Sequence, residues 1–252
     1  MSLRAANITV QLSEKTILSG INVDFKAGQL TGLVGPNGVG KSTLLRALAG
    51  LQAVSSGQVL FGEQSIQDMA PLNKAKKIAY LPQTHECHWP LPVERVVLLG
   101  RHPHNDGHHV SDKSLQAVKE AIAEADIGHL VGRPVNELSG GERARVMLAR
   151  ALATQSDILL ADEPIVSLDP RHQIDVMALL QSLARKGKTV IVVLHELHLA
   201  MRYCQQLVLL ESGKNVTEGS PIDVLTAKNL RDVYGTDAIF GSHHGTSWVL
   251  PW

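Results

Sequence analysis

The residues best suited to chemistry form a glycine-rich segment, GPNGVGKST, at positions 35–43. The segment fits the pattern G-x-x-x-x-G-K-[ST] and lies between the apolar run LTGLV and the amphipathic stretch KSTLLRALAGL. Its glycines let the backbone curl so that its amides point inward, and a following helix adds positive potential. We therefore expect a phosphate-binding loop made of Gly35, Pro36, Asn37, Gly38, Val39, Gly40, Lys41, Ser42 and Thr43.

Two further features complete a nucleotide site. The Lys41 ammonium suits the outer phosphates, and the Ser42 hydroxyl suits Mg²⁺. A second apolar run, ILLADEP at 158–164, ends in the adjacent acids Asp162 and Glu163, which point to opposite faces of a strand. One acid can hold the metal through water while the other orients or deprotonates the attacking water.

These residues need a sheet to position them. The runs at 158–164 and 189–196 are apolar almost throughout, as in strands buried on both faces of a parallel sheet, and helical patterns at 172–187 and 197–204 suggest crossovers. Further strands are predicted by short runs of alternating apolar and polar residues in 3–34 and by the segments GQVLFG and KIAYLPQ. A polar connection separates the last two segments. Residues 84–150 are helical in pattern, which predicts an α/β fold with a helical insertion.

Composition narrows the function. The 252 residues are 44% hydrophobic, enough for one sizeable core, and 24 basic side chains balance 24 acidic ones, so net charge favours no nucleic-acid partner. No leader-like segment and no run of 18 apolar residues is present, so we expect a cytoplasmic chain that reaches a membrane only through a partner. Cys87 and Cys204 are expected to be free thiols.

Five motifs in a fixed order make the chain resemble the ATP-binding subunit of ABC transporters. They are GPNGVGKST, Gln83 in YLPQ, LSGGE at 138–142, SLDP at 167–170, and His195 after TVIVVL. The resemblance runs from about residue 3 to about 220. It implies a P-loop NTPase core with an N-terminal antiparallel β subdomain and an inserted α-helical subdomain near 84–150, all within 1–236, followed by a tail at 237–252 in which we find no signal.

The resemblance implies a homodimer in which the LSGGE turn of one subunit caps the ATP held by the loop of the other. It implies MgATP hydrolysis, with Glu163 as general base and His195 at the γ-phosphate. Gln83 would link Mg²⁺ and the lytic water to the helical insertion. The implied cap consists of Ser139, Gly140 and Gly141, Asp169 would lie at the dimer interface, and the implied Mg²⁺ ligands are Ser42, Gln83 and Asp162.

The chain departs from the family pattern in three places. Leu12 occupies the place of an aromatic residue that stacks on adenine, which predicts weaker or less base-selective binding. Ile165 and Val166 replace the usual small polar pair, which affects contacts at the dimer interface. Glu196 follows the histidine where Asp is frequent.

The stretch VERVVLLGRHPH at 93–104 is similar to ATPases of iron-siderophore, haem and cobalamin importers. This implies separate permease subunits docking near 84–109, an indirectly coupled substrate-binding protein, and a peripheral position on the cytoplasmic side of the membrane. The cargo could also be another metal or small solute. A soluble, non-transport ABC ATPase and a module that binds ATP without turnover remain alternatives.

Six histidines near the glutamine motif suggest a metal site only weakly, because none of them has strong ligand spacing. We interpret them as solvated; they are His85, His88, His102, His104, His108 and His109.

Overall fold

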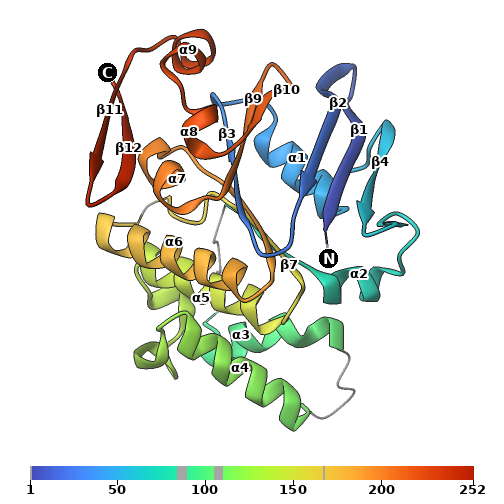
Figure 1. Ribbon diagram of the computed structural model, residues 1–252. Coiled ribbons are helices and arrows are strands. Elements are labelled where there is room, and N and C mark those ends of the chain that lie inside the picture. The colour runs from blue at the N-terminus through green and yellow to red at the C-terminus, as the bar shows by residue number, and fades with distance from the viewer. Residues whose placement is uncertain (1, 84–89, 105–109, 167) are drawn as a thin grey trace. The chain divides into compact units, whose positions relative to one another are not determined.

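The computed structural model describes residues 2–83, 90–104, 110–166 and 168–252. The chain divides into two compact units, one formed by residues 1–69 with 180–252 and the other by residues 70–179 (Figure 1). Each unit is described by itself. None of the helices within the described ranges is long and apolar enough to cross a membrane.

The first unit contains an antiparallel sheet of order β2-β1-β4-β5, built mostly from the N-terminal residues. Its strands are β1 (Leu3–Leu12), β2 (Lys15–Phe25), β4 (Ser56–Phe61) and β5 (Gln64–Ser65). Alternate residues of β1 and β2 are buried, for example Ile8, Val10, Ile21 and Val23. The alternation is that of strands with one face on the core, and it confirms the expected N-terminal β subdomain.

The same unit holds the parallel strands that carry the nucleotide motifs. Strand β3 (Leu30–Val34) lies between β8 (Thr189–Val193) and β9 (Gln206–Glu211) and runs parallel to both. Every residue of β3 and β8 is buried, as their continuous apolar sequences predict. Strand β10 (Lys214–Gly219) pairs antiparallel with β9. The unit's helices are α1 (Lys41–Leu48), α7 (Leu197–Tyr203), α8 (Pro221–Val224), α9 (Ala227–Asn229) and the π-helical turn η4 (Leu230–Tyr234).

The C-terminal residues form a structured element. Strands β11 (Ala238–His243) and β12 (Thr246–Pro251) make an antiparallel hairpin beside α7 (Figure 1). Val249 is fully buried, and the Trp252 backbone N–H donates to the Asp237 carbonyl at 2.8 Å. The hairpin is therefore packed and closed at its base, although no pattern in residues 237–252 indicated it.

The second unit is mainly helical. Helices α3, α4 and α5 pack against one another (Figure 1). The expected polar connection before KIAYLPQ contains a short helix, α2, which begins with a proline at a position where the missing N–H costs nothing. The helices and turns are α2 (Pro71–Lys77), α3 (Val93–Leu98), η1 (Leu99–His104), α4 (Asp112–Glu124), η2 (Gly128–Leu130), η3 (Val135–Glu137) and α5 (Gly140–Ala153). Strands β6 (Ile78–Leu81) and β7 (Ile158–Asp162) pair in parallel, and α6 (Pro170–Arg185) begins in this unit.

Arg101, in the stretch LGRHPH, has a structural role in this unit. Its guanidinium is buried and donates to the Ser114 hydroxyl at 3.0 Å and to the Ala153 carbonyl at 2.9 Å. It therefore joins η1 to α4 and to the end of α5. His104 contacts the Thr154 carbonyl at 2.9 Å, next to the same joint.

Candidate nucleotide site

The GPNGVGKST segment forms the loop between β3 and α1. Gly35, Gly38 and Gly40 have φ angles of 144°, 77° and 102°, a region that residues with a side chain rarely adopt. These conformations agree with the curled backbone expected from the motif. Ser42 and Thr43 lie in the first turn of α1, whose N-terminal amides provide positive potential for an anion.

Lys41 is only 5% exposed, although it carries a charge. Its ammonium donates to the carbonyl oxygens of Gly35 at 2.7 Å and Pro36 at 2.8 Å. The charge is therefore held over the loop by backbone dipoles.

His195 belongs to the same edge of the parallel strands as the loop. Leu33 of β3 is in register with Val193 of β8, and both strands run in the same direction. The carboxyl ends of the two strands thus meet at one edge, which is the usual ligand edge of a parallel sheet. The loop follows one strand and His195 follows the other.

Gln83 and Glu163 come together within the second unit. They follow the parallel neighbours β6 and β7, and the Gln83 amide donates to the Glu163 carboxylate at 2.7 Å. Glu163 has a φ of 51°, in the left-handed region that non-glycine residues occupy at a cost of about 1 kcal/mol or more. Such strain is concentrated at functional sites, which fits a role for this carboxylate.

Asp162 is fully buried, and its carboxylate accepts a hydrogen bond from the Tyr80 hydroxyl at 3.1 Å. Sequence reasoning overlooked Tyr80. A phenol in the middle of a buried strand needs a polar partner, so its place in KIAYLPQ could have indicated one.

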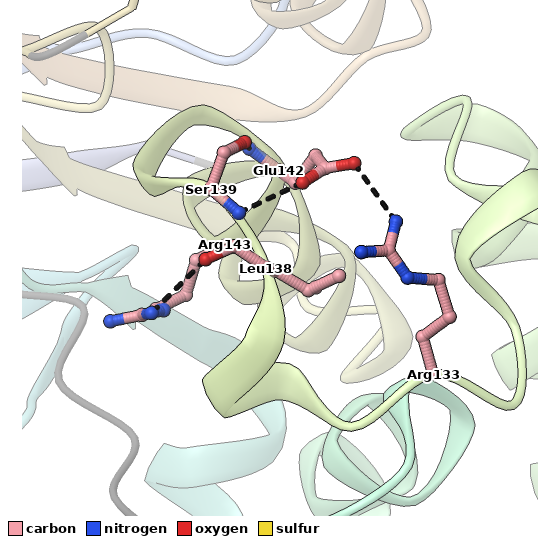
Figure 2. A network of polar contacts seen from close by, with 5 residues as sticks. All are labelled: Arg133, Leu138, Ser139, Glu142 and Arg143. Atoms are coloured by element: carbon pink, nitrogen blue, oxygen red, sulfur yellow. Dashed lines mark hydrogen bonds and ion pairs between the residues drawn. The ribbon is translucent and has the colours of Figure 1, made fainter.

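The LSGGE turn forms a capping box at the start of α5 (Figure 2). The Ser139 hydroxyl accepts from the Glu142 backbone N–H at 3.3 Å, and the Glu142 carboxylate accepts from the Ser139 N–H at 2.8 Å. Arg133 donates to the same carboxylate at 3.2 Å, and Arg143 donates to the Leu138 carbonyl at 3.2 Å. Hydrogen bonds from Ser139, together with the Arg133 charge, lower the pKa of Glu142.

A cavity of about 510 Å³ opens beside this turn. Ser139, Gly141, Glu142, Asp169 and His172 line part of it. Asp169 accepts from the His172 backbone N–H at 3.0 Å, and this bond lowers the pKa of Asp169. The second unit thus brings Ser139 and Gly141 of the expected cap to one cavity with Asp169, the expected interface residue.

Comparison with known proteins decides the family. The family model described as ABC transporter matches residues 18–166. A hemin import ATP-binding protein, HmuV, of Pseudomonas aeruginosa is 42% identical over 246 residues, covering 96% of this chain and 95% of that protein. The chain belongs to the ABC transporter family. It is an ABC ATPase.

Other relatives agree with this assignment. A cobalamin import ATP-binding protein, BtuD, of Halobacterium salinarum is 37% identical to this chain. The match covers 99% of this chain and 63% of that protein. A chain from a metal-chelate type ABC transporter in an inward-facing conformation superposes with a TM-score of 0.86 at 26% identity, covering 100% of this chain and 97% of that one. A bacterial ABC transporter cassette solved as a dimer superposes with a TM-score of 0.77 at 28% identity. The match covers 87% of this chain and 99% of that one.

The structure places the three departures from the ABC pattern. Leu12 is 43% exposed at the end of β1, where it pairs with Lys15. Ile165 is buried whereas Val166 is exposed, and Glu196 directly precedes α7. The apolar residue at 165 therefore serves packing.

Most of the histidine-rich stretch lies outside the described residues, so the interpretation of these histidines as solvated stays a prediction. No group of three His, Cys, Asp or Glu side chains with metal-binding geometry occurs in the part of the chain that the structure describes. His85, Cys87, His88, His108 and His109 lie outside the described residues. Cys204 is a free, buried thiol, as expected, and burial raises its pKa.

Proposed function

We propose that this ABC ATPase powers the import of an iron-siderophore, haem or cobalamin-type cargo through separate permease subunits. The observation that carries the proposal is the similarity to hemin import ATP-binding proteins over nearly the whole of both chains. The cobalamin import relative supports the wider cargo class. The stretch LGRHPH, with Arg101 at its centre, is the sequence feature that favours the same class.

In this proposal two copies pair head to tail around ATP. The phosphate loop of one copy holds the nucleotide, and Ser139, Gly140 and Gly141 of the other approach the γ-phosphate. The positive end of α5 suits that anion. Asp169, beside the same cavity, lies at the interface and communicates between the two sites. Loss of the γ-phosphate on hydrolysis removes the contact, so ATP turnover opens the pair.

The hydrolytic step is assigned to named side chains in this proposal. Glu163 takes the proton of the attacking water, and the hydrogen bond from Gln83 fixes its carboxylate. His195 contacts the γ-phosphate, and Lys41 supplies a charge to the outer phosphates. Ser42, Gln83 and Asp162 offer oxygen donors of the kind that Mg²⁺ prefers, and the ion neutralises developing phosphate charge when bound.

The membrane partner docks in this proposal near residues 84–109. Arg101 and His104 lie on η1, which is fixed to the end of α5, so force on this surface is transmitted into α5, the helix that Ser139 caps. A substrate-binding protein delivers cargo on the other side of the permease. The ATPase is then peripheral, on the cytoplasmic face, and has no nucleic-acid partner.

Co-purification tests the proposal. The tagged chain is expressed in its native membrane background, solubilised gently, and its partners are identified by mass spectrometry. We expect a polytopic membrane protein at equal stoichiometry, and ATPase activity in liposomes that rises when cargo-loaded binding protein is added. Lys41→Ala is the matched control, because it should abolish tight nucleotide binding while keeping the docking surface.

The alternatives predict different results. Recovery with ribosomal or DNA-associated proteins would replace the importer by a soluble ABC ATPase. A permease whose activity responds to another metal or small solute would keep the importer and change the cargo. Absence of phosphate release with the permease bound would indicate a module that holds ATP without turnover.

A further inference from the structure

The segment formed by β6 and the residues after it donates a hydrogen bond to each of the two adjacent acids that end ILLADEP. The Tyr80 hydroxyl donates to the Asp162 carboxylate at 3.1 Å, and the Gln83 amide donates to the Glu163 carboxylate at 2.7 Å. Gln83 belongs to a motif of the ABC pattern. Tyr80 belongs to none of the chemical assignments made above, although its partner is the candidate metal ligand.

The strand register explains why the phenol of Tyr80 reaches Asp162. Tyr80 is paired with Leu160 in the parallel ladder of β6 and β7. Side chains alternate between the faces of a strand, so Leu160 and Asp162 share a face, and Tyr80 lies on that face with them. Two residues of a strand span about 6.6 Å, a distance that the long side chain of tyrosine covers. The contact therefore follows from how the two strands pair.

Asp162 is a residue for which such a donor matters. It is fully buried, and a buried carboxylate is costly unless it is hydrogen-bonded. Tyr80 stands on a paired strand between the buried residues Ala79 and Leu81. A hydrogen bond from a side chain held in this way restrains the rotation of the carboxylate. The orientation of Asp162 thus depends on β6 as well as on its own strand.

Tyr80 also borders a cavity of about 220 Å³. Leu99 and Pro103 of η1 line the same cavity. Tyr80 therefore lies next to the LGRHPH stretch while its hydroxyl contacts Asp162. Because the residue is part of this lining, a substitution that tests the hydroxyl must keep the ring.

We propose that Tyr80 is a positioning residue that orients the Asp162 carboxylate for Mg²⁺. The proposal rests on the proposed role of Asp162 in holding the metal that accompanies ATP. Tyr80 acts through Asp162, so it contributes only when the metal is bound. Loss of its hydroxyl should therefore weaken the part of ATP binding that depends on Mg²⁺ and leave metal-free binding unchanged.

Tyr80→Phe tests this, because it removes one oxygen and keeps the ring. The dissociation constant of ATP is measured for the full chain in Mg²⁺ and in EDTA, and the ratio of the two constants gives the gain in affinity due to the metal. We expect this gain to fall by about three- to tenfold, the effect of one lost hydrogen bond, with the constant in EDTA unchanged within about twofold. In the assembled transporter, the Mg²⁺ concentration for half-maximal phosphate release should rise by a similar factor while the maximal rate stays within about twofold.

Two further variants separate a positioning role from a structural one. Tyr203→Phe is the matched control, because it makes the same change in a buried tyrosine of α7 whose ring lies under the Arg202 guanidinium. Asp162→Asn should itself lower the gain due to Mg²⁺. Adding Tyr80→Phe to Asp162→Asn should lower the gain no further, because the two residues act as one unit.

Thermal unfolding is measured on the same samples. A lower unfolding temperature of Tyr80→Phe with an unchanged gain due to Mg²⁺ would show a structural role only and would overturn the proposal. An equal loss in Tyr203→Phe, or a further loss in the double variant, would overturn it as well, because the phenol would then not act through Asp162. If Asp162→Asn keeps the full gain, the metal assignment of the proposed function fails, and the role of Tyr80 fails with it.

Discussion

The side-chain amide of Gln83 donates a hydrogen bond of 2.7 Å to the carboxylate of Glu163. The two residues follow adjacent parallel strands and are separated by 80 positions in the sequence. Glu163 adopts a left-handed backbone conformation, so both its backbone and its side chain are fixed. The contact thus ties the candidate base to the segment that leads into the proposed permease-docking region.

Glu163→Gln should stop hydrolysis and retain ATP. Glutamine keeps the shape and can still accept from Gln83, but it cannot take a proton, so kcat should fall by about 10²- to 10⁴-fold. The trapped ATP should hold two chains together, which size-exclusion chromatography in MgATP would detect. Asp157→Asn is the control, because it removes a surface carboxylate of the same unit that pairs with Lys77 at 2.9 Å. A Glu163→Gln chain that stays monomeric in ATP would contradict the head-to-tail pair.

Gln83→Leu should separate nucleotide binding from turnover. Leucine has nearly the same size but offers no donor to Glu163, so the carboxylate loses its fixed orientation. We expect a fall in kcat of about tenfold or more, as for other losses of positioning, with ATP affinity of the single chain nearly unchanged. Phosphate release and nucleotide titration measure the two quantities. Equal losses of kcat and of ATP affinity would mean that Gln83 acts mainly by supporting the nucleotide or its metal.

Ser139→Ala should leave ATP binding to the single chain intact and stop turnover, since its hydroxyl is proposed to act across the dimer. Loss of one donor to a transition-state anion lowers kcat by about 10²- to 10³-fold. Ser111→Ala is a close control, because Ser111 caps α4 of the same unit by accepting from the Ser114 N–H at 3.2 Å. Both variants lose a helix cap worth about 1 kcal/mol of stability. If both lose activity equally, the effect of Ser139 is one of stability.

The contacts around Gln83 and Ser139 also show how far the sequence could be interpreted. Glycine spacing and apolar runs depend on local geometry. They therefore predicted the phosphate loop, the buried strands β3, β7 and β8, and the helical stretch. The pairing of Gln83 with Glu163 required the order of the strands. It follows from the parallel register of β6 and β7, which no local pattern encodes.

The C-terminal segment was not predictable for a related reason. The strands β11 and β12 carry polar and apolar residues without clear alternation, and only Val249 among them is fully buried. Their stability comes from packing on α7 and from closure by Trp252, which are long-range contacts.

Glu142→Gln should show a pH-dependent loss of stability. The pKa of Glu142 is lowered in the folded chain, first by the Ser139 backbone hydrogen bond, so its charge stabilises the fold above the ordinary value of 4.5. This contribution is lost as pH falls through the still lower folded pKa. The free energy of unfolding, measured with urea, should therefore be lower in the variant than in the parent chain by about 0.5 kcal/mol near pH 7. This difference should shrink below pH 4.5. A deficit that stays constant between pH 7 and pH 3 would mean that shape, not charge, matters at this position.

Leu12→Tyr should restore a stacking surface for the base. Leu12 is 43% exposed at the end of β1, so an aromatic ring can be placed there without disturbing the core. If the base lies over this position, as the family resemblance implies, stacking worth about 1 kcal/mol tightens ATP binding by about fivefold. Pyrimidine triphosphates should gain less, because their rings offer a smaller face. Val216→Tyr, at a strand position of similar exposure in the same unit, controls for a general effect of an added surface tyrosine. An unchanged ATP affinity in Leu12→Tyr alone would place the base elsewhere, and the leucine would then not explain any weakness in nucleotide binding.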